Sequence, residues 1–357
     1  MPFNTEFFYK ASKPYKVASV DSDFAAVQKI LAKVFKKIQE KTPHFNPKDV
    51  EVYLHGSYAN NTNTYFPSHL EVMVELKKTG EYDSSKGPSQ NYLVYKNYFV
   101  ETAYQFNPVD FSELLLETLK EELGKKVTQH EKFIVIAPTW DIKHTVEITP
   151  CFTFNYIETS DKEPEQPEDE GNTAPSQATI PSTVFKGVLL YDHGMGAHYV
   201  TFPKLHAING NAKDVATQGN FLKITRLFKT LNKIGMRESQ FNRTRGYFVQ
   251  CLLYNVPHAM FSSDEVRVQL TESAARTAGA KLPEIGPSTE GAEIEAIFIK
   301  ILNYLLHADI ESFACQNLVW HLFGEAAEFW SYPEAYKFIR NIKNLYEDFP
   351  SSRTELV

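Results

Sequence analysis

The sequence has few cysteines and none of the spacings that cysteine-based sites require. Its 357 residues contain three, Cys151, Cys251 and Cys315, which lie far apart and form no Cys-x-x-Cys pair. Disulfide frameworks and structural zinc sites depend on several cysteines at close, characteristic spacings, so neither is indicated. The cysteine content therefore favours a reducing, cytoplasmic environment.

Long apolar runs and an excess of positive charge are also missing. No stretch approaches the roughly 20 apolar residues that a membrane span requires. The formal net charge is -7, whereas binding to duplex nucleic acid relies on a broad basic surface. We therefore expect a soluble protein that binds neither a membrane nor duplex nucleic acid, while small anionic ligands remain compatible with its charge.

The periodicity of apolar residues predicts both helices and strands. Intervals of three and four residues predict a helix over 21–41, and alternation predicts strands over 50–54 and 70–76. The same patterns predict further helices over 92–106 and 110–123, and further strands over 132–137 and 145–152. These segments make up an α/β lobe with a small mixed sheet.

Residues 158–182 differ in composition from their surroundings. Between residues 158 and 180, seven acidic residues lie near a single cation, Lys162, and three prolines interrupt regular structure. Such a segment cannot bury enough apolar surface to fold, so we expect a disordered acidic loop. A solvated insertion without a function is the first interpretation, and a docking segment is the alternative.

The chain after residue 187 is predicted to be mostly helical, with helices over 214–234, 293–307 and 333–346. The expected organisation is thus a core over 1–157, whose N-terminal helix spans both lobes, the acidic loop over 158–182 and a helical lobe over 183–357. A ligand cleft is expected between the two lobes.

The residues with the most chemical information follow the first predicted strand. Gly56 and Ser57 come directly after it, and backbone N–H groups at such a turn can hold a phosphate. His69 and Glu71 alternate on the next strand, so their side chains emerge on the same face and can share a metal. A solvated glutamate and a surface histidine are the alternative interpretation.

These motifs resemble those of the cGAS/DncV-like family of nucleotidyltransferases, which belongs to the DNA polymerase β superfamily. The family tends to read GSYANGTN, then an SDxDVxV strand, and later a strand that ends in DVxPC. This chain has GSYANNTN, SHLEVMV and VEITPC. The resemblance implies a polymerase β-like core with a C-terminal helical lobe, and it assigns the metal and catalytic positions to His69, Glu71 and Glu147.

The second lobe is similar to the family as well, in the segment YVTFPKLH, in Asn209-Gly210 and in a basic helix. In the family, basic residues of this helix approach the triphosphate, and the Gly-Ser turn holds phosphate. The nucleotide-binding residues that the resemblance implies are Gly56, Ser57, Asn60, Lys223, Arg226 and Lys229. A solvated basic face is the alternative for the three cations.

The family joins nucleoside triphosphates or their deoxy forms into short linear or cyclic oligonucleotide signals and releases pyrophosphate, using two divalent ions, Mg²⁺ or Mn²⁺. The resemblance implies this activity here, within a bacterial antiphage system and with an effector protein encoded nearby. The partners would be nucleoside triphosphates or an oligonucleotide.

The site departs from the family's three aspartates at each position. Each glutamate moves its carboxylate by about 1.5 Å, the length of one carbon–carbon bond, and a misplacement of about 1 Å can cost around a hundredfold in rate. His69 removes a bridging carboxylate, and imidazole suits Mn²⁺ better than Mg²⁺. A degenerate, non-catalytic protein that binds a nucleotide or oligonucleotide and regulates a partner is therefore the alternative.

Overall fold

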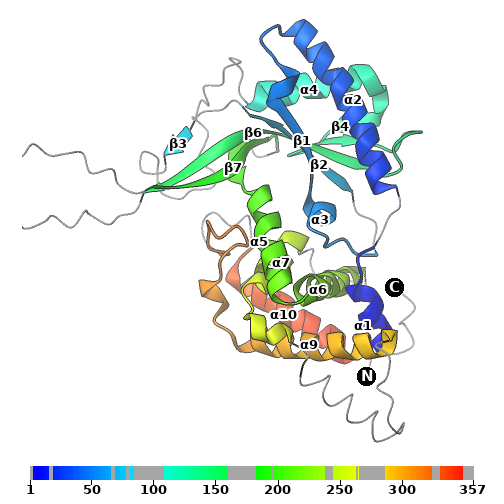
Figure 1. The fold of residues 1–357 in the computed structure, drawn as a ribbon, viewed down its shortest axis with the longest axis vertical. Helices are drawn as coiled ribbons and strands as arrows, with labels where there is room; N and C mark the ends of the chain where they lie inside the picture. The colour runs from blue at the N-terminus through cyan, green and yellow to red at the C-terminus, as the bar shows by residue number, and fades with distance from the viewer. Residues whose placement is uncertain are drawn as a thin grey trace, which may run out of the picture.

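The computed structural model has two parts, a sheet with helices on one face and a lobe made of helices (Figure 1). It describes residues 3–15, 19–65, 69–77, 81–83, 108–159, 182–194, 196–237, 244–262, 264, 286–323 and 330–348. The helices are α1 (Thr5–Ser12), α2 (Val20–Lys41), α3 (Gly56–Ala59), α4 (Pro108–Leu123), α5 (Pro203–Ala216), α6 (Asn220–Arg237), α7 (Gly246–Tyr254), α9 (Pro287–His307) and α10 (Tyr332–Asp348), with single 3₁₀ turns at Pro47–Asp49, Gly124–Lys126, His258–Phe261 and Ile310–Ser312. The strands are β1 (Val50–His55), β2 (Leu70–Leu76), β3 (Glu81–Asp83), β4 (Val127–Gln129), β5 (Ile134–Ile136), β6 (Val146–Thr159), β7 (Ser182–Asp192) and β8 (Ala197–Thr201).

The strands form one mixed sheet, which confirms the fold class expected from the sequence. Its main path runs β1-β2-β6-β5-β4, and β7 continues from β6 to β8. β2 is parallel to β6 and antiparallel to β1, while β7 is antiparallel to both of its neighbours. The long strand β6 therefore connects the two ends of the sheet.

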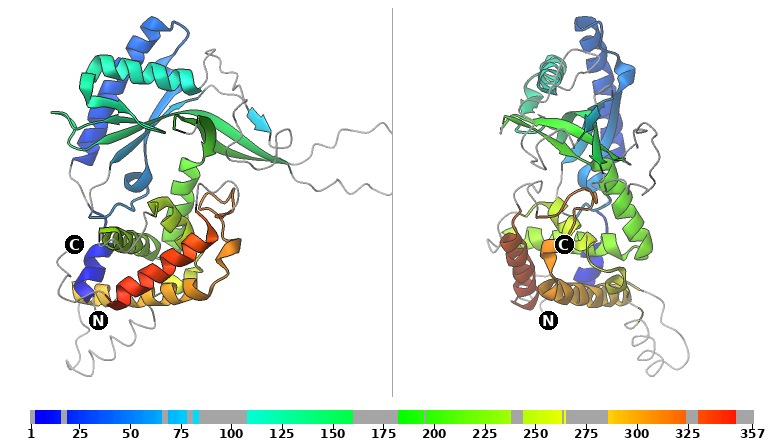
Figure 2. Two further views of the ribbon diagram at one scale, coloured as in Figure 1. Left: turned by 180° about the vertical axis from the view of Figure 1, so that it is seen from behind. Right: turned by 90° about the vertical axis from the view of Figure 1, so that its left-hand side faces the viewer.

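One face of the sheet is apolar and is covered by α2 and α4 (Figures 1 and 2). Alternate residues of β2 and β6, such as Val72, Val74 and Ile148, join the stripe of α2 in a single buried cluster. Because side chains alternate along a strand, the residues between them point to the opposite face. That second face is turned toward the helical lobe and carries the polar residues described below.

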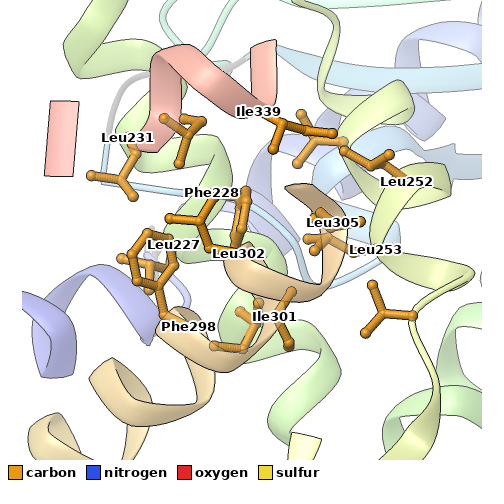
Figure 3. Close-up of a cluster of buried hydrophobic side chains, with 14 of the residues drawn as sticks. Leu227, Phe228, Leu231, Leu252, Leu253, Phe298, Ile301, Leu302, Leu305 and Ile339 are labelled. Carbon is orange, nitrogen blue, oxygen red and sulfur yellow. The ribbon is translucent and has the colours of Figure 1, made fainter. Parts of the chain in front are cut away.

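The helical lobe has its own apolar core, which Figure 3 shows in close-up. Helices α1, α6, α7, α9 and α10 contribute to it, and the rings of Phe228 and Phe298 lie 5.2 Å apart at its centre. Each fully buried side chain of this size stabilises the fold by about 1.5–3 kcal/mol. This core fixes the position of α6, whose basic residues approach the sheet.

The predicted start of the helix over 214–234 is wrong. α5 ends at Ala216 and α6 begins at Asn220, because Gln218 and Gly219 take positive φ angles of 54° and 84° and turn the chain. The carboxylate of Asp214, expected inside the helix, instead accepts the N–H of Leu222 at 2.9 Å near the start of α6.

The prediction of mostly helical structure after residue 187 is also wrong up to Thr201, since β7 and β8 extend the sheet.

The division of the chain into domains at residues 157 and 183 stays a prediction. In the structure the sheet continues to Thr201 and the following helices begin with α5. The N-terminal segment reaches both parts with two helices, since α1 packs in the helical core and α2 against the sheet. The predicted helix over 92–106 and most of the acidic segment lie outside the described residues. None of the described helices is long and apolar enough to span a membrane.

Candidate functional site

Two glutamates lie side by side on the sheet face opposite α2 and α4. The register pairs Glu71 of β2 with Glu147 of β6, and it pairs Glu71 with His55 of β1 on its other side. We call Glu71 and Glu147 the carboxylate row. The structure thus brings together two of the three positions that the sequence pointed to, on neighbouring parallel strands.

The Gly56–Ser57 turn begins where β1 ends, next to the carboxylate row. Ser57 donates its backbone N–H to Oε2 of Glu71 at 3.1 Å. Gly56 has a φ of 66°, and a Cβ atom added to it would lie 1.4 Å from the same carboxylate oxygen. Glycine is therefore required here both for its backbone conformation and for the close approach of Glu71.

The environment of Glu71 disfavours its charged form. Burial raises the pKa of Glu71 above its ordinary value of 4.5, the N–H of Ser57 opposes that rise, and the nearby charge of Glu147 adds to it. A carboxylate with a raised pKa, next to another carboxylate, is typical of functional sites. Such a group is more easily neutralised or displaced than a solvent-exposed glutamate.

His69 lies at the edge of the carboxylate row and contacts Glu147. Its Nδ1 atom is within hydrogen-bonding distance of Oε1 of Glu147. The side chain of His69 is 57% exposed and that of Glu147 is 16% exposed. The three positions implied by the resemblance are therefore close together, with Glu71 accepting the N–H of Ser57 and Glu147 contacting His69.

The placement of these side chains does not fit a metal site. Among the described residues, no group of three or more histidine, cysteine, aspartate or glutamate side chains is gathered so that it could hold a metal ion. Glu71 turns to a backbone N–H and Glu147 to an imidazole, whereas two-metal catalysis requires shared ligands around ions about 3.5–4 Å apart. The described side chains as placed therefore do not present the donor set that two-metal catalysis requires.

Two cations of α6 reach toward the turn and are almost fully buried. Arg226 donates to the carbonyl oxygen of Asn61 at 2.5 Å and to that of Ser12 at 2.6 Å. Lys229 donates to the hydroxyl oxygen of Thr62 at 3.0 Å. Both side chains hold the segment that follows the Gly56–Ser57 turn against the helical lobe, and they bring positive charge to the neighbourhood of Glu71.

Burial also shifts the pKa of these two cations. The pKa of Lys229 is lowered from 10.5 to about 7, mainly by burial, with a contribution from the charges of Lys233 and Arg226, while Glu71 opposes the shift. Burial lowers the pKa of Arg226 to about 10. Lys229 therefore changes its charge near neutral pH, and an anion bound beside it would favour the protonated form.

The other predicted phosphate-binding residues are placed differently. Lys223 forms an ion pair with Glu290 at 2.9 Å, and Lys13 contacts the same carboxylate. Asn60 is buried, and its Oδ1 atom has no hydrogen-bond partner among the described residues. Asn60 thus lies beside the turn with an acceptor available, whereas Lys223 is engaged in a separate contact within the helical lobe.

Sequence reasoning missed a second polar group on the same sheet face, which we call the Lys204 network. Lys204 donates to Glu75 at 2.9 Å and to Glu51 at 3.1 Å, and Thr153 donates its hydroxyl to Glu75 at 2.6 Å. The ammonium group also lies 4.6 Å from the ring centre of Tyr53. The alternation of Glu71 with Glu75 on one strand was the available signal for Glu75, but nothing local in the sequence indicated Lys204.

Comparison with known proteins gives matches that cover both parts of the fold. Residues 208–278 match the model of the cGAS/DncV-like nucleotidyltransferase C-terminal helical domain. The cyclic nucleotide synthase CdnE01 of Staphylococcus haemolyticus is 24% identical over 328 residues, which cover 90% of this chain and 91% of the relative. The cyclic UMP-AMP synthase of Rhodothermus marinus is 26% identical over 298 residues, which cover 83% of this chain and 84% of the relative.

Solved structures share the fold over nearly the whole chain. The Rhodothermus marinus CdnE c-UMP-AMP synthase with Apcpp and Upnpp has a TM-score of 0.62 at 22% identity and covers 97% of both chains. The Elizabethkingia meningoseptica CdnE cyclic dinucleotide synthase with GTP and Apcpp has a TM-score of 0.63 at 17% identity, covering 96% of this chain and 99% of the other. The agreement extends from the sheet through the helical lobe, and residues 208–278 match the family's own C-terminal helical domain, so this chain resembles the cGAS/DncV-like nucleotidyltransferases in sequence and in fold.

Proposed function

We propose that this chain joins nucleoside triphosphates or their deoxy forms into a short linear or cyclic oligonucleotide and releases pyrophosphate. The observation that carries the proposal is the position of Glu71 and Glu147, paired in register on parallel strands beside the Gly56–Ser57 turn. The relatives named above, a cyclic nucleotide synthase and a cyclic UMP-AMP synthase, support the same reaction class.

In the reaction a hydroxyl oxygen of one nucleotide attacks the α-phosphorus of another, and the bond from that phosphorus to pyrophosphate breaks. Gly56, Ser57 and Asn60 are the proposed phosphate contacts, with Arg226 and Lys229 offsetting the negative charge of the triphosphate. Lys223, occupied by Glu290, is proposed as a contact of the incoming nucleotide only after that ion pair opens.

The attacking hydroxyl must lose a proton, and three side chains at the site can accept it. These are the carboxylates of Glu71 and Glu147 and the imidazole of His69, the catalytic residues of the proposal. Because the donor set as placed does not fit a metal site, no step is assigned to an ion. The metal series of the assay below tests whether Mg²⁺ or Mn²⁺ supports the reaction.

The test is a product screen with purified protein. Mixtures of all NTPs and dNTPs are incubated with Mg²⁺, Mn²⁺ or no metal, and pyrophosphate release and oligonucleotide products are measured. We expect product from the wild type and none from Glu147→Ala. Absence of product in every mixture, under conditions where a relative with three aspartates turns over, would contradict the proposal.

A second candidate function is favoured by the partners that His69, Glu71 and Glu147 find within the protein. In this alternative the chain binds a nucleotide or oligonucleotide without turnover and regulates a partner. Nucleotide would then raise the melting temperature while no pyrophosphate is released, and the absence of any shift would count against it. In either case we propose that an effector protein encoded nearby, within an antiphage system, responds to the product or to the bound state.

A further inference from the structure

The side chain of Glu71 fills the Gly56–Ser57 turn from the neighbouring strand. Its Oε2 atom accepts the N–H of Ser57 at 3.1 Å. A Cβ atom on Gly56 would lie 1.4 Å from Oε2 and 2.2 Å from the carboxylate carbon. Two features of the turn, its N–H group and the space above its glycine, are therefore both taken by the same carboxylate.

This contact depends on the length of the glutamate side chain. Glu71 faces His55 across the strand pair, and the turn begins at the residue after His55. An aspartate in the same position would end about 1.5 Å earlier, the length of one carbon–carbon bond. At that distance its carboxylate would no longer reach the N–H of Ser57 within a normal hydrogen bond.

The carboxylate brings negative charge to the place where a phosphate would bring its own. Two like charges about 4 Å apart repel each other, and more strongly where water is excluded. Lys229 and the N–H of Ser57 both favour the charged form of Glu71, so the positive groups near the turn already have an anion to stabilise. An incoming triphosphate must compete with that anion.

We propose that Glu71 is a built-in anion that occupies the Gly56–Ser57 turn, and that it does not serve as a metal ligand in this chain. The poor fit to a metal follows from the same geometry, because Glu71 accepts the N–H of Ser57 while Glu147 contacts His69. Competition between Glu71 and a nucleotide for the turn is a consequence that rests on the proposed function. The assignment of Glu71 as the group that occupies the turn does not depend on the proposed function.

The experiment compares the wild type with Glu71→Asp and Glu71→Gln, and it uses Glu117→Asp on the exposed side of α4 as the matched control. Binding of Mn²⁺ alone is followed by electron paramagnetic resonance. Hydrogen exchange of the Ser57 amide reports the contact to Glu71, and binding of a non-hydrolysable NTP analogue without metal is measured by calorimetry. Melting curves establish that every variant is folded.

We expect no stoichiometric Mn²⁺ binding by the wild type, and faster exchange of the Ser57 amide in Glu71→Asp. That variant should bind the analogue about tenfold more tightly, the effect of releasing one hydrogen bond to a charged group. Glu71→Gln keeps a hydrogen-bond acceptor but removes the negative charge that competes with the triphosphate, so it should also bind the analogue more tightly than the wild type. Glu117→Asp should match the wild type in all three measurements.

Stoichiometric Mn²⁺ binding by the wild type that is lost in Glu71→Gln would overturn the assignment. So would an unchanged exchange rate of the Ser57 amide in Glu71→Asp. An analogue that binds to none of the variants would instead contradict the proposed function, while the Mn²⁺ and exchange measurements would still decide the role of Glu71. If Glu71→Asp does not fold, the wild type and Glu71→Gln decide it through Mn²⁺ binding.

Discussion

Two glutamates on β2, Glu71 and Glu75, lie four residues apart on the same face of the sheet, and their surroundings differ. Glu75 is 4% exposed and accepts hydrogen bonds from Lys204 and Thr153. Glu71 accepts the backbone N–H of Ser57 and lies beside the like charge of Glu147. Glu75 therefore has a direct cationic partner, whereas Glu71 has a backbone N–H group and a neighbouring carboxylate that repels it.

The lysines associated with these glutamates show the same contrast. Burial opposes the charge of Lys204, but its hydrogen bonds to Glu75 and Glu51 outweigh burial and raise the pKa of Lys204 above 10.5. Burial lowers the pKa of Lys229 to about 7. The fold therefore favours the charged form of Lys204 and disfavours the charged form of Lys229. Charge kept at a cost to stability is typical of a functional site rather than of a structural network.

The largest expected effect is the dependence of stability on Lys229 and pH. Its pKa of about 7 in the folded protein lies below the ordinary value of 10.5, so the unfolded chain binds more protons between these two values. The free energy of unfolding of the wild type, relative to Lys229→Met, should therefore rise with pH above about 7, by up to about 1.4 kcal/mol per pH unit. Denaturant titrations from pH 6.5 to 9.5 measure it.

The control for that series is Lys36→Met, since Lys36 is exposed on α2. Its difference from the wild type should stay constant over the same pH range. A constant difference for Lys229→Met as well would contradict the lowered pKa, and with it the contrast between the two lysines.

The second largest effect on stability is expected from removing the cation of the Lys204 network. Lys204→Met leaves the carboxylate of Glu75 buried without its ammonium partner. Loss of one partner of a fully buried pair costs about 3–5 kcal/mol. Lys204 is 44% exposed, so a loss of about 2–3 kcal/mol in the free energy of unfolding is expected from denaturant titration. Adding Glu75→Gln should recover part of the loss, and a double variant less stable than Lys204→Met would contradict the pairing.

The hydroxyl that bonds to Glu75 should have a smaller effect. Thr153→Val keeps the shape of the side chain but removes the donor that lies 2.6 Å from the carboxylate. A hydrogen bond to a charged group contributes about 1.5–3 kcal/mol, and we expect the lower end of that range because Lys204 remains. Thr128→Val, at an exposed position of β4, is the control and should change stability by less than about 0.5 kcal/mol.

Local sequence patterns predicted most of the sheet's strands, the Gly56–Ser57 turn and Glu71 near it, because alternation along a strand decides which side chains share a face, whereas Glu147 was indicated by the family resemblance alone. They did not predict that the carboxylate of Glu71 reaches the turn. That contact depends on the extra methylene group of glutamate and on the absence of a side chain at Gly56. Lys204 was missed because only the folded chain brings it to a residue 129 positions away. The break between α5 and α6 was missed although Gly219 marked it, because apolar spacing was followed through the turn.

The smallest expected effect has the opposite sign and separates the two glutamates most directly. Glu71→Gln removes a charge that burial and Glu147 disfavour, and its amide oxygen can still accept the N–H of Ser57. Because the pKa of Glu71 is raised in the folded protein, the folded state binds more protons than the unfolded chain as the pH rises above about 4.5, and the wild type loses stability there. Glu71→Gln should therefore be more stable than the wild type at pH 7, by up to about 1 kcal/mol, and this advantage should disappear at pH 4. Glu75→Gln at pH 7 should be less stable than the wild type, because Lys204 then loses its charged partner. If both substitutions changed stability in the same direction in parallel denaturant titrations, the two carboxylates would not differ in kind, and Glu71 would be one more member of a structural network.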